Sequence, residues 1–134
     1  MKQIIQTDRA PAAVGPYSQA VVVPCRELIF CAGQIPLDPD TQELIQGDIQ
    51  AEARRCMDNV RAVLEAAGSS MEGIVKATVY LVDIGDFAAV NDVYKEYFPG
   101  DPPARSAVGV NELPKGAHIE IEVIASRQNP LKDN

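Results

Sequence analysis

Apolar residues recur at helical spacing along one long segment, residues 48–68. Roughly every third or fourth position from Ile49 to Ala67 is apolar, which predicts an amphipathic helix with one buried face. Asp48 is a residue type that caps helix N-termini, and Gly68 can adopt the left-handed conformation that ends a helix.

A second helix is predicted from Asp86, a candidate N-cap, to Phe98, because a Pro-Gly pair follows. The apolar row on this helix has one polar member, Asn91, which lies four residues after Phe87. Two interpretations fit this pattern equally. Asn91 is either an edge residue half exposed to water or a polar group aimed at a pocket.

Short runs rich in β-branched and aromatic residues predict strands. They lie at residues 3–6, 19–23, 28–32, 74–82, 106–110 and 119–126. This order of strands and helices predicts a single α+β domain over residues 1–134, with two helices on one face of a mixed sheet. Two helices shield only one face, so we expect oligomerisation to cover the other.

Alternation in the last predicted strand places its side chains on two faces. One face carries Ile119, Ile121, Val123 and Ala125, and the other carries His118, Glu120, Glu122 and Ile124. Composition alone favours two solvated glutamates, because buried glutamate is rare. The large aliphatic Ile124 on the same side indicates a face that is only partly wet.

Arg105 stands just ahead of a predicted strand and follows two prolines. It fits a surface arginine in a loop, but the small residues around it leave the guanidinium room to turn inward. The planar fork of arginine suits a fixed clamp on a carboxylate or phosphate. A glutamate near such a clamp could hold and activate a water molecule, as hydrolysis of a small anion requires.

The formal net charge is −7, which opposes binding to phosphate backbones. Arg54, Arg55 and Arg61 form the densest basic group, but acidic residues share their helix. This pattern is typical of a solvated, salt-bridged face, so a nucleic-acid partner is not expected.

No apolar stretch is long enough to span a membrane, and the N-terminus lacks the pattern of a secretory signal. We therefore expect a cytoplasmic protein. Cys25, Cys31 and Cys56 form no CxxC pair and are expected to be free thiols, with Cys56 buried on the first helix. No metal or cofactor site is predicted, because the cysteines and the single histidine lack ligand spacing.

Six stretches of the sequence, in order along nearly the whole chain, carry a family resemblance. They are "APAAVGPYSQA", "CAGQIPLDP", "VLEAAG", "KATVYLVDIGDFAAVNDVY", "PPARSAV" and "IEIEVIA". Together they resemble the RidA/YjgF family of reactive-intermediate deaminases. The resemblance implies a chorismate-mutase-like α+β subunit in a homotrimer, with the sheets forming the core and active sites between subunits.

The resemblance also implies an activity, the hydrolysis of 2-imino acids and their enamine tautomers to 2-keto acids and ammonia. By position, Arg105 matches the residue that grips the substrate carboxylate, and Glu120 matches the residue that positions the attacking water. Tyr17, Gly33 and Asn91 match pocket positions.

Two positions depart from the family pattern. Ala107 stands where the family often has Cys, in a position expected to contact substrate, and Ala32 stands where it often has Ser. We expect these departures to affect substrate range and rate rather than reaction type, because the chemistry needs no covalent nucleophile. His118, expected on the same face as Glu120, is the competing candidate base, although a plain position at a strand start is favoured.

Rival functions belong to other classes. One is a regulatory trimer that binds keto acids or related metabolites without turnover. Another is a ribonuclease or translation-initiation inhibitor, a label attached to some members of the family, which the negative charge disfavours.

Overall fold

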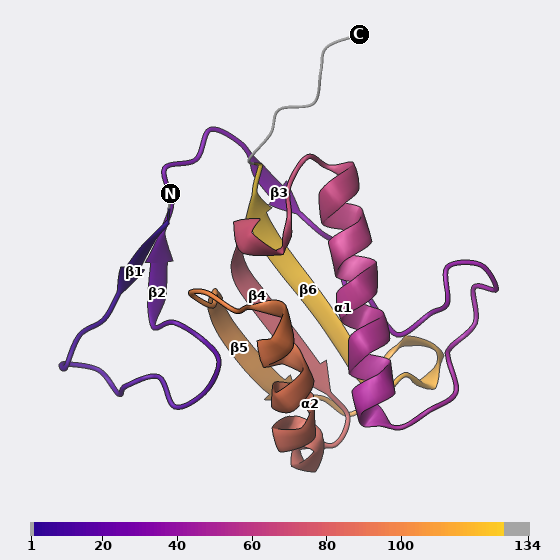
Figure 1. Ribbon diagram of the computed structural model, residues 1–134. Coiled ribbons are helices and arrows are strands. Elements are labelled where there is room, and N and C mark those ends of the chain that lie inside the picture. Colours follow the sequence, from indigo (N-terminus) through magenta and orange to yellow (C-terminus); the bar gives the residue numbers. More distant parts are fainter. Residues whose placement is uncertain (1, 128–134) are drawn as a thin grey trace, which may run out of the picture.

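A computed structural model describes residues 2–127 of the chain (Figure 1). Its strands and helices, in chain order, are β1 (Gln3–Ile5), β2 (Ala20–Val22), β3 (Leu28–Phe30), α1 (Ile49–Ala66), β4 (Ile74–Leu81), α2 (Phe87–Tyr94), β5 (Ala104–Gly109) and β6 (Ile119–Ser126). Short 3₁₀ turns precede β4, flank α2 and precede β6. The α+β order predicted from the sequence is confirmed over these residues.

The main sheet has four strands in the order β3-β6-β4-β5. Strand β6 runs antiparallel to both β3 and β4, whereas β4 and β5 are parallel, so the sheet is mixed. Both helices lie on one face of this sheet (Figure 1). Strands β1 and β2 form a separate antiparallel hairpin beside it.

Strand β5 begins two residues earlier than predicted, so Arg105 lies inside the strand rather than ahead of it. The parallel pairing with β4 already starts at Ala104, which is paired with Lys76. Ala104 also forms a bridge with Ser18 on its other side. The pairing matters because it fixes the face of the sheet to which Arg105 points.

Helix α1 begins and ends as its sequence predicts. The side chain of Asp48 accepts a hydrogen bond from the amide of Ala51 at 2.9 Å, which satisfies one free donor of the first turn. Gly68 adopts a φ of 81°, the left-handed conformation that closes the helix. The apolar face of α1, including the fully buried Cys56, packs on the sheet.

Asp86 stands at the N-cap position of α2 as predicted, but its side chain does not cap the helix. Asp86 itself has helical backbone angles and makes no capping hydrogen bond with its side chain. A 3₁₀ turn over Ile84–Asp86 leads directly into the helix, and Asp83 caps that turn by accepting from the amide of Gly85 at 2.8 Å. The helix is α-helical only to Tyr94 and then tightens into a 3₁₀ turn before Phe98.

Strand β6 alternates as predicted between buried and half-buried side chains. Its buried residues pack under the helices, and Glu120, Glu122 and Ile124 face the other side. That side, which we call the open face, also carries Phe30, whose side chain is 72% exposed. Within residues 2–127 no helix is long and apolar enough to cross a membrane.

Candidate active site

Arg105 lies on the helix-covered face of the sheet. It is paired in register with Ala77, which is completely buried beneath the helices. Its guanidinium carbon lies 4.9 Å from the ring centre of Tyr94, 5.0 Å from that of Phe87 and 5.6 Å from that of Tyr17. Rings at these distances attract a cation and hold its flat group in place.

Asn91 provides the polar contact of this cation. Nη1 of Arg105 donates a hydrogen bond to Oδ1 of Asn91 at 2.6 Å. Of the two interpretations of Asn91, the structure supports the polar group aimed at a pocket. Phe87 precedes Asn91 by one helical turn, so α2 presents both to the same guanidinium.

The positive charge of Arg105 has no carboxylate partner among residues 2–127. Burial lowers the pKa of its guanidinium, and the neighbouring Tyr94 and Tyr17 act in the opposite direction. A half-buried cation without a counter-ion favours binding of an anion, because the anion restores the stabilisation that was lost with water.

A hollow of about 290 Å³ opens beside this guanidinium. It is lined by Val14, Gly15, Tyr17, Phe87, Asn91, Arg105 and Ala107. The structure therefore brings together four residues expected at the site, namely Tyr17, Asn91, Arg105 and Ala107. Val14, Gly15 and Phe87 were not predicted, although the helical row shared by Phe87 and Asn91 was a usable signal.

The segment that carries Tyr17 is fastened to the start of β5. The hydroxyl of Ser18 donates to the carbonyl of Pro102 at 2.6 Å, and the amide of Ser18 donates to the carbonyl of Pro103 at 3.1 Å. Within the segment, the amide of Val14 donates to the hydroxyl of Tyr17 at 3.3 Å. These contacts place the ring of Tyr17 beside Arg105.

Glu120 and Gly33 form a second group, on the open face. Glu120 is paired in register with Tyr80 of β4. A Cβ atom at Gly33 would collide with the carboxylate of Glu120, so this position accepts only glycine without a shift of the glutamate. The adjacent Glu122 accepts a 2.5 Å hydrogen bond from the hydroxyl of Tyr80, whereas no described residue donates to Glu120.

The two groups lie on opposite faces of the same sheet. In register terms, Arg105 shares its face with Ala77 and Val123, whereas Glu120 shares its face with Tyr80 and Thr78. Side chains that leave a sheet in opposite directions cannot contact one small molecule within a single chain. Each chain therefore presents two separate halves of the expected site.

The expectation that His118 shares the face of Glu120 is wrong. Nδ1 of His118 lies 2.9 Å from Oε2 of Glu52, a largely buried residue of α1. His118 precedes the first residue of β6, so the alternation of the strand does not govern it. Its ring turns toward the helices, which leaves Glu120 without a histidine beside it.

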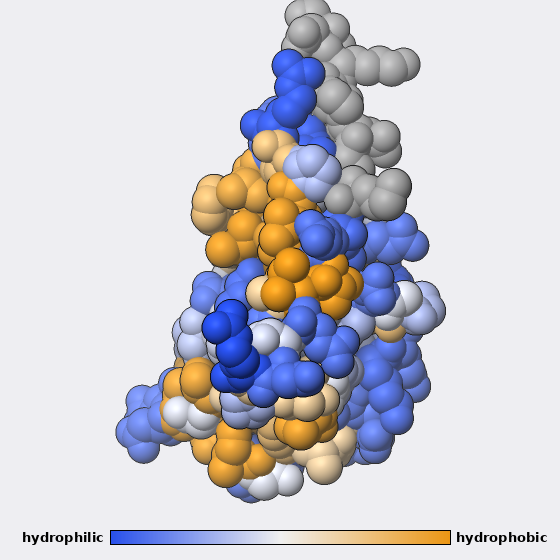
Figure 2. Space-filling view, turned by 90° about the vertical axis from the view of Figure 1, so that its left-hand side faces the viewer, coloured by the Kyte–Doolittle hydropathy of each residue, from blue (hydrophilic) through white to orange (hydrophobic). Residues whose placement is uncertain are grey.

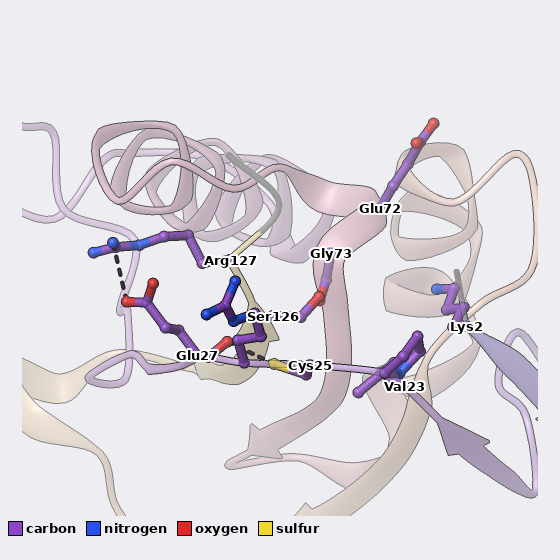
Figure 3. A pocket seen from close by; sticks show the side chains of 10 residues that line it. Lys2, Val23, Cys25, Glu27, Glu72, Gly73, Ser126 and Arg127 are labelled. Atoms are coloured by element: carbon purple, nitrogen blue, oxygen red, sulfur yellow. Dashed lines mark hydrogen bonds and ion pairs between the residues drawn. The ribbon is translucent and has the colours of Figure 1, made fainter. Parts of the chain in front are cut away.

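A larger hollow, of about 700 Å³, contains none of the residues expected at the site. It lies between the connection from β2 to β3 and the end of β6 (Figure 3). An ion pair between Arg127 and Glu27, 3.0 Å long, crosses one side of it. Within residues 2–127 no three His, Cys, Asp or Glu side chains gather where they could hold a metal ion.

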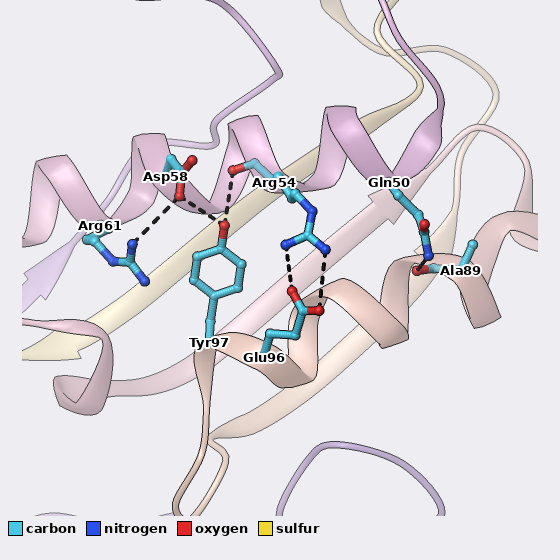
Figure 4. Close-up of polar contacts among 7 residues, drawn as sticks. All are labelled: Gln50, Arg54, Asp58, Arg61, Ala89, Glu96 and Tyr97. Carbon is cyan, nitrogen blue, oxygen red and sulfur yellow. Dashed lines mark hydrogen bonds and ion pairs between the residues drawn. The ribbon is translucent and has the colours of Figure 1, made fainter.

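The arginines of α1 are engaged with polar groups, as their pattern predicts (Figure 4). Arg54 forms two hydrogen bonds with the carboxylate of Glu96, and Arg61 lies 3.7 Å from that of Asp58. Arg55 donates to the side chain of Asn59. This helix face is therefore largely neutralised and offers no free basic patch.

Comparison with known proteins identifies the family. The family model described as "Endoribonuclease L-PSP" matches residues 7–127. Protein DfrA of Myxococcus xanthus is 52% identical, over 92% of this chain and 95% of that protein. The 2-iminobutanoate/2-iminopropanoate deaminase of Capra hircus is 50% identical, over 98% of this chain and 93% of that protein.

Among solved structures, E. coli TdcF with bound serine has a TM-score of 0.71 and 45% sequence identity, over 94% of this chain and 99% of that one. The chain belongs to the RidA/YjgF family, the family of the L-PSP model. The resemblance seen in its sequence motifs is thus confirmed.

Proposed function

We propose that this protein is an enzyme that hydrolyses reactive 2-imino acids and their enamine tautomers to 2-keto acids and ammonia. The observation that carries the proposal is the half-buried guanidinium of Arg105, which lines a small hollow and has no carboxylate partner among the described residues. The name of the goat relative and the amino acid bound to E. coli TdcF support a small carboxylate as ligand.

The complete site lies between two copies of the chain in a homotrimer. Arg105, Tyr17, Asn91 and Ala107 come from one copy, and Glu120 and Gly33 come from the open face of its neighbour. The opposite directions of Arg105 and Glu120 support this arrangement, because neither half is complete within one chain. The exposed Phe30 on the open face also favours burial against another copy.

Arg105 binds the carboxylate of the imino acid through its remaining N–H groups while Asn91 holds Nη1. Hydrogen bonds to charged groups contribute roughly 1.5–3 kcal/mol each, enough to fix the orientation of a small ligand. The protonated imine carbon is already electrophilic. Water held by Glu120 of the neighbouring copy adds to that carbon, and the carboxylate takes a proton from it. Glu120 then returns this proton to the nitrogen of the tetrahedral adduct. The C–N bond breaks to release ammonia while the hydroxyl group loses its proton and becomes the keto oxygen.

Substitution of Arg105 tests the proposal. Arg105→Ala and Arg105→Lys should each lower kcat/KM by about 10²–10⁴-fold, because lysine lacks the fork that binds a carboxylate in two places. The assay couples a threonine dehydratase to the protein and follows release of 2-ketobutyrate.

Arg61→Lys is the matched control for this experiment, because Arg61 also stacks over a ring, that of Tyr97 at 4.9 Å, but lies in the helix layer. It should leave turnover unchanged. Near-wild-type release of 2-ketobutyrate by Arg105→Lys would contradict the proposal that Arg105 clamps the substrate carboxylate. Tight binding of 2-ketobutyrate by a wild-type protein that does not hydrolyse the imine would favour the regulatory alternative.

The ribonuclease alternative follows from the wording of the family description. The net charge of −7 and the neutralised arginines of α1 oppose it. RNA cleavage that persists in highly purified Arg105→Ala would support the ribonuclease alternative.

A further inference from the structure

One end of the hollow beside Arg105 is polar and the other is apolar. The guanidinium of Arg105 and the amide of Asn91 form the polar end. Val14, the ring of Phe87 and the methyl group of Ala107 supply apolar lining. A ligand with a carboxylate at one end and a hydrocarbon group at the other matches this distribution.

Ala107 determines how far the hollow extends along β5. It follows Arg105 by two residues and is paired with the buried Val79, so both project from the same face of the strand. Alanine is the smallest residue with a side chain. Any larger side chain at this position would take space from a ligand held by Arg105.

Val14 is the most exposed large apolar residue among those described, at 90% exposure. A single exposed valine is ordinary on a protein surface, and its side chain is free to contact a ligand in the hollow. The hydrogen bond from its amide to the hydroxyl of Tyr17 holds this residue at the edge of the hollow. The side of the molecule that carries the β1–β2 hairpin shows apolar patches on its surface (Figure 2).

Within one copy, before the neighbour contributes its half of the site, the hollow has more room than a small imino acid needs. A volume of about 290 Å³ corresponds to roughly ten water molecules at about 30 Å³ each. An imino acid derived from aminobutyrate has only about seven non-hydrogen atoms, so the part of the site that one copy supplies leaves space beyond its side chain.

We infer that this hollow binds the side chain of the substrate and that the site favours 2-imino acids with large apolar side chains, branched or aromatic. The inference rests on the function proposed above and names the substrate class. Ala107 provides the space, and Phe87 and Val14 contact the hydrocarbon group. Each additional buried methylene should favour the larger substrate by about fourfold.

The test compares kcat/KM for imino acids released by an amino-acid oxidase from alanine, leucine and phenylalanine. In the wild-type protein the value should be at least about tenfold higher for the leucine-derived imine than for the alanine-derived one. Ala107→Leu should reverse this ratio, mainly through the KM of the larger imine, because the new side chain fills the hollow.

Val14→Ser is the second variant, because a residue this exposed can be replaced without disturbing the core. It should lower the ratio of leucine-derived to alanine-derived kcat/KM about fourfold. Val22→Ser is the matched control, a 51% exposed valine of β2 that does not line the hollow, and it should leave the ratio unchanged.

Equal kcat/KM across the series in the wild type would overturn the inference, as would a ratio that neither Ala107→Leu nor Val14→Ser alters. These outcomes leave the proposed function intact. Absence of turnover with every imino acid would instead overturn the proposed function, and this inference with it.

Discussion

The two faces of the main sheet differ in how completely the chain supplies contacts for their charged side chains. On the helix-covered face, Arg105 is held by three aromatic rings and by Asn91, all from the same chain. On the open face, Glu120 receives no hydrogen bond from any described residue. The surroundings of Arg105 are therefore preorganised within the chain, whereas in our proposal the surroundings of Glu120 are completed by a neighbouring copy.

This difference separates ligand recognition, which we assign to Arg105, from reactivity, which we assign to Glu120. A guanidinium fixed by rings and an amide recognises a carboxylate with little loss of conformational entropy. The carboxylate of Glu120 lies directly against Gly33, in the space that a side chain at this position would occupy. Recognition is built within the chain, and in our proposal reactivity depends on assembly.

The largest expected effect comes from combining two inactive variants. Arg105→Ala and Glu120→Gln should each lower turnover by about 10²–10⁴-fold, through loss of the clamp and of proton transfer respectively. Co-expression should restore activity, because random assortment in a ring pairs intact halves at about a quarter of the sites. The measurement is kcat per site in the co-purified oligomer.

Arg105→Ala combined with Asn91→Ala is the matched control for this experiment. Asn91 and Arg105 belong to the same half of the proposed site, so every site in the mixed oligomer has one of these two residues substituted. Activity should therefore stay at the average of the two separate variants. Absence of recovery with Arg105→Ala and Glu120→Gln, in an oligomer shown to contain both chains, would contradict a site shared between copies.

A smaller effect is expected from substitution of Gly33, which tests only the Glu120 group on the open face. In Gly33→Ala the new Cβ would collide with the carboxylate of Glu120 and displace it. We expect kcat to fall about tenfold or more while the KM for the substrate changes little, because misplacement of a catalytic group by a small distance is costly.

Gly100→Ala is the control for Gly33→Ala, since a Cβ at Gly100 meets no atom within 4 Å. Steady-state kinetics and thermal unfolding of both variants separate the two causes. If Gly33→Ala lost stability but kept its kcat, the contact with Glu120 would be structural only.

The smallest effect is expected in the helix layer, away from both halves. The hydroxyl of Tyr97 donates to Oδ1 of Asp58 at 2.9 Å (Figure 4). Burial and this hydrogen bond raise the pKa of Tyr97 to about 12. Tyr97→Phe should lower the free energy of unfolding by about 1 kcal/mol at neutral pH and leave turnover unchanged.

The pH dependence of this effect has a definite sign. The pKa of the phenol is higher in the folded chain than its ordinary value of 10. Its contribution to stability is therefore complete below about pH 10 and is lost as the pH rises toward 12. Denaturant unfolding at about pH 7 and about pH 11 should show a smaller difference between the wild type and Tyr97→Phe at the higher pH. A constant difference would contradict this assignment.

Local patterns predicted most of the fold because they reflect local physics. The spacing of apolar residues from Ile49 to Ala67 specifies the buried face of α1, and the alternation from Ile119 to Ser126 specifies both faces of β6. Asp48 was predicted as a cap because a short acidic side chain at a helix start can accept from the free amides of the first turn, as it does from Ala51.

Local patterns could not predict features that depend on residues distant in sequence, such as strand pairing. The start of β5 depends on β4 and Ser18, which are distant in sequence, so the inclusion of Arg105 in the strand was not predictable. Asp86 and His118 fail for a related reason, because a neighbouring turn or helix decides their direction. The motifs named the candidate site residues, and the register shows which of them share a face.

Strand β6 ties folding and chemistry to the same eight residues. Its central place between β3 and β4 means that a slip by one position would turn its isoleucines into water and its glutamates into the core. A chain that misaligns this strand therefore loses stability, because apolar side chains would face water and carboxylates would face the core. In our proposal, the alignment that stabilises the sheet therefore also directs the reactive carboxylate of Glu120 toward the open face.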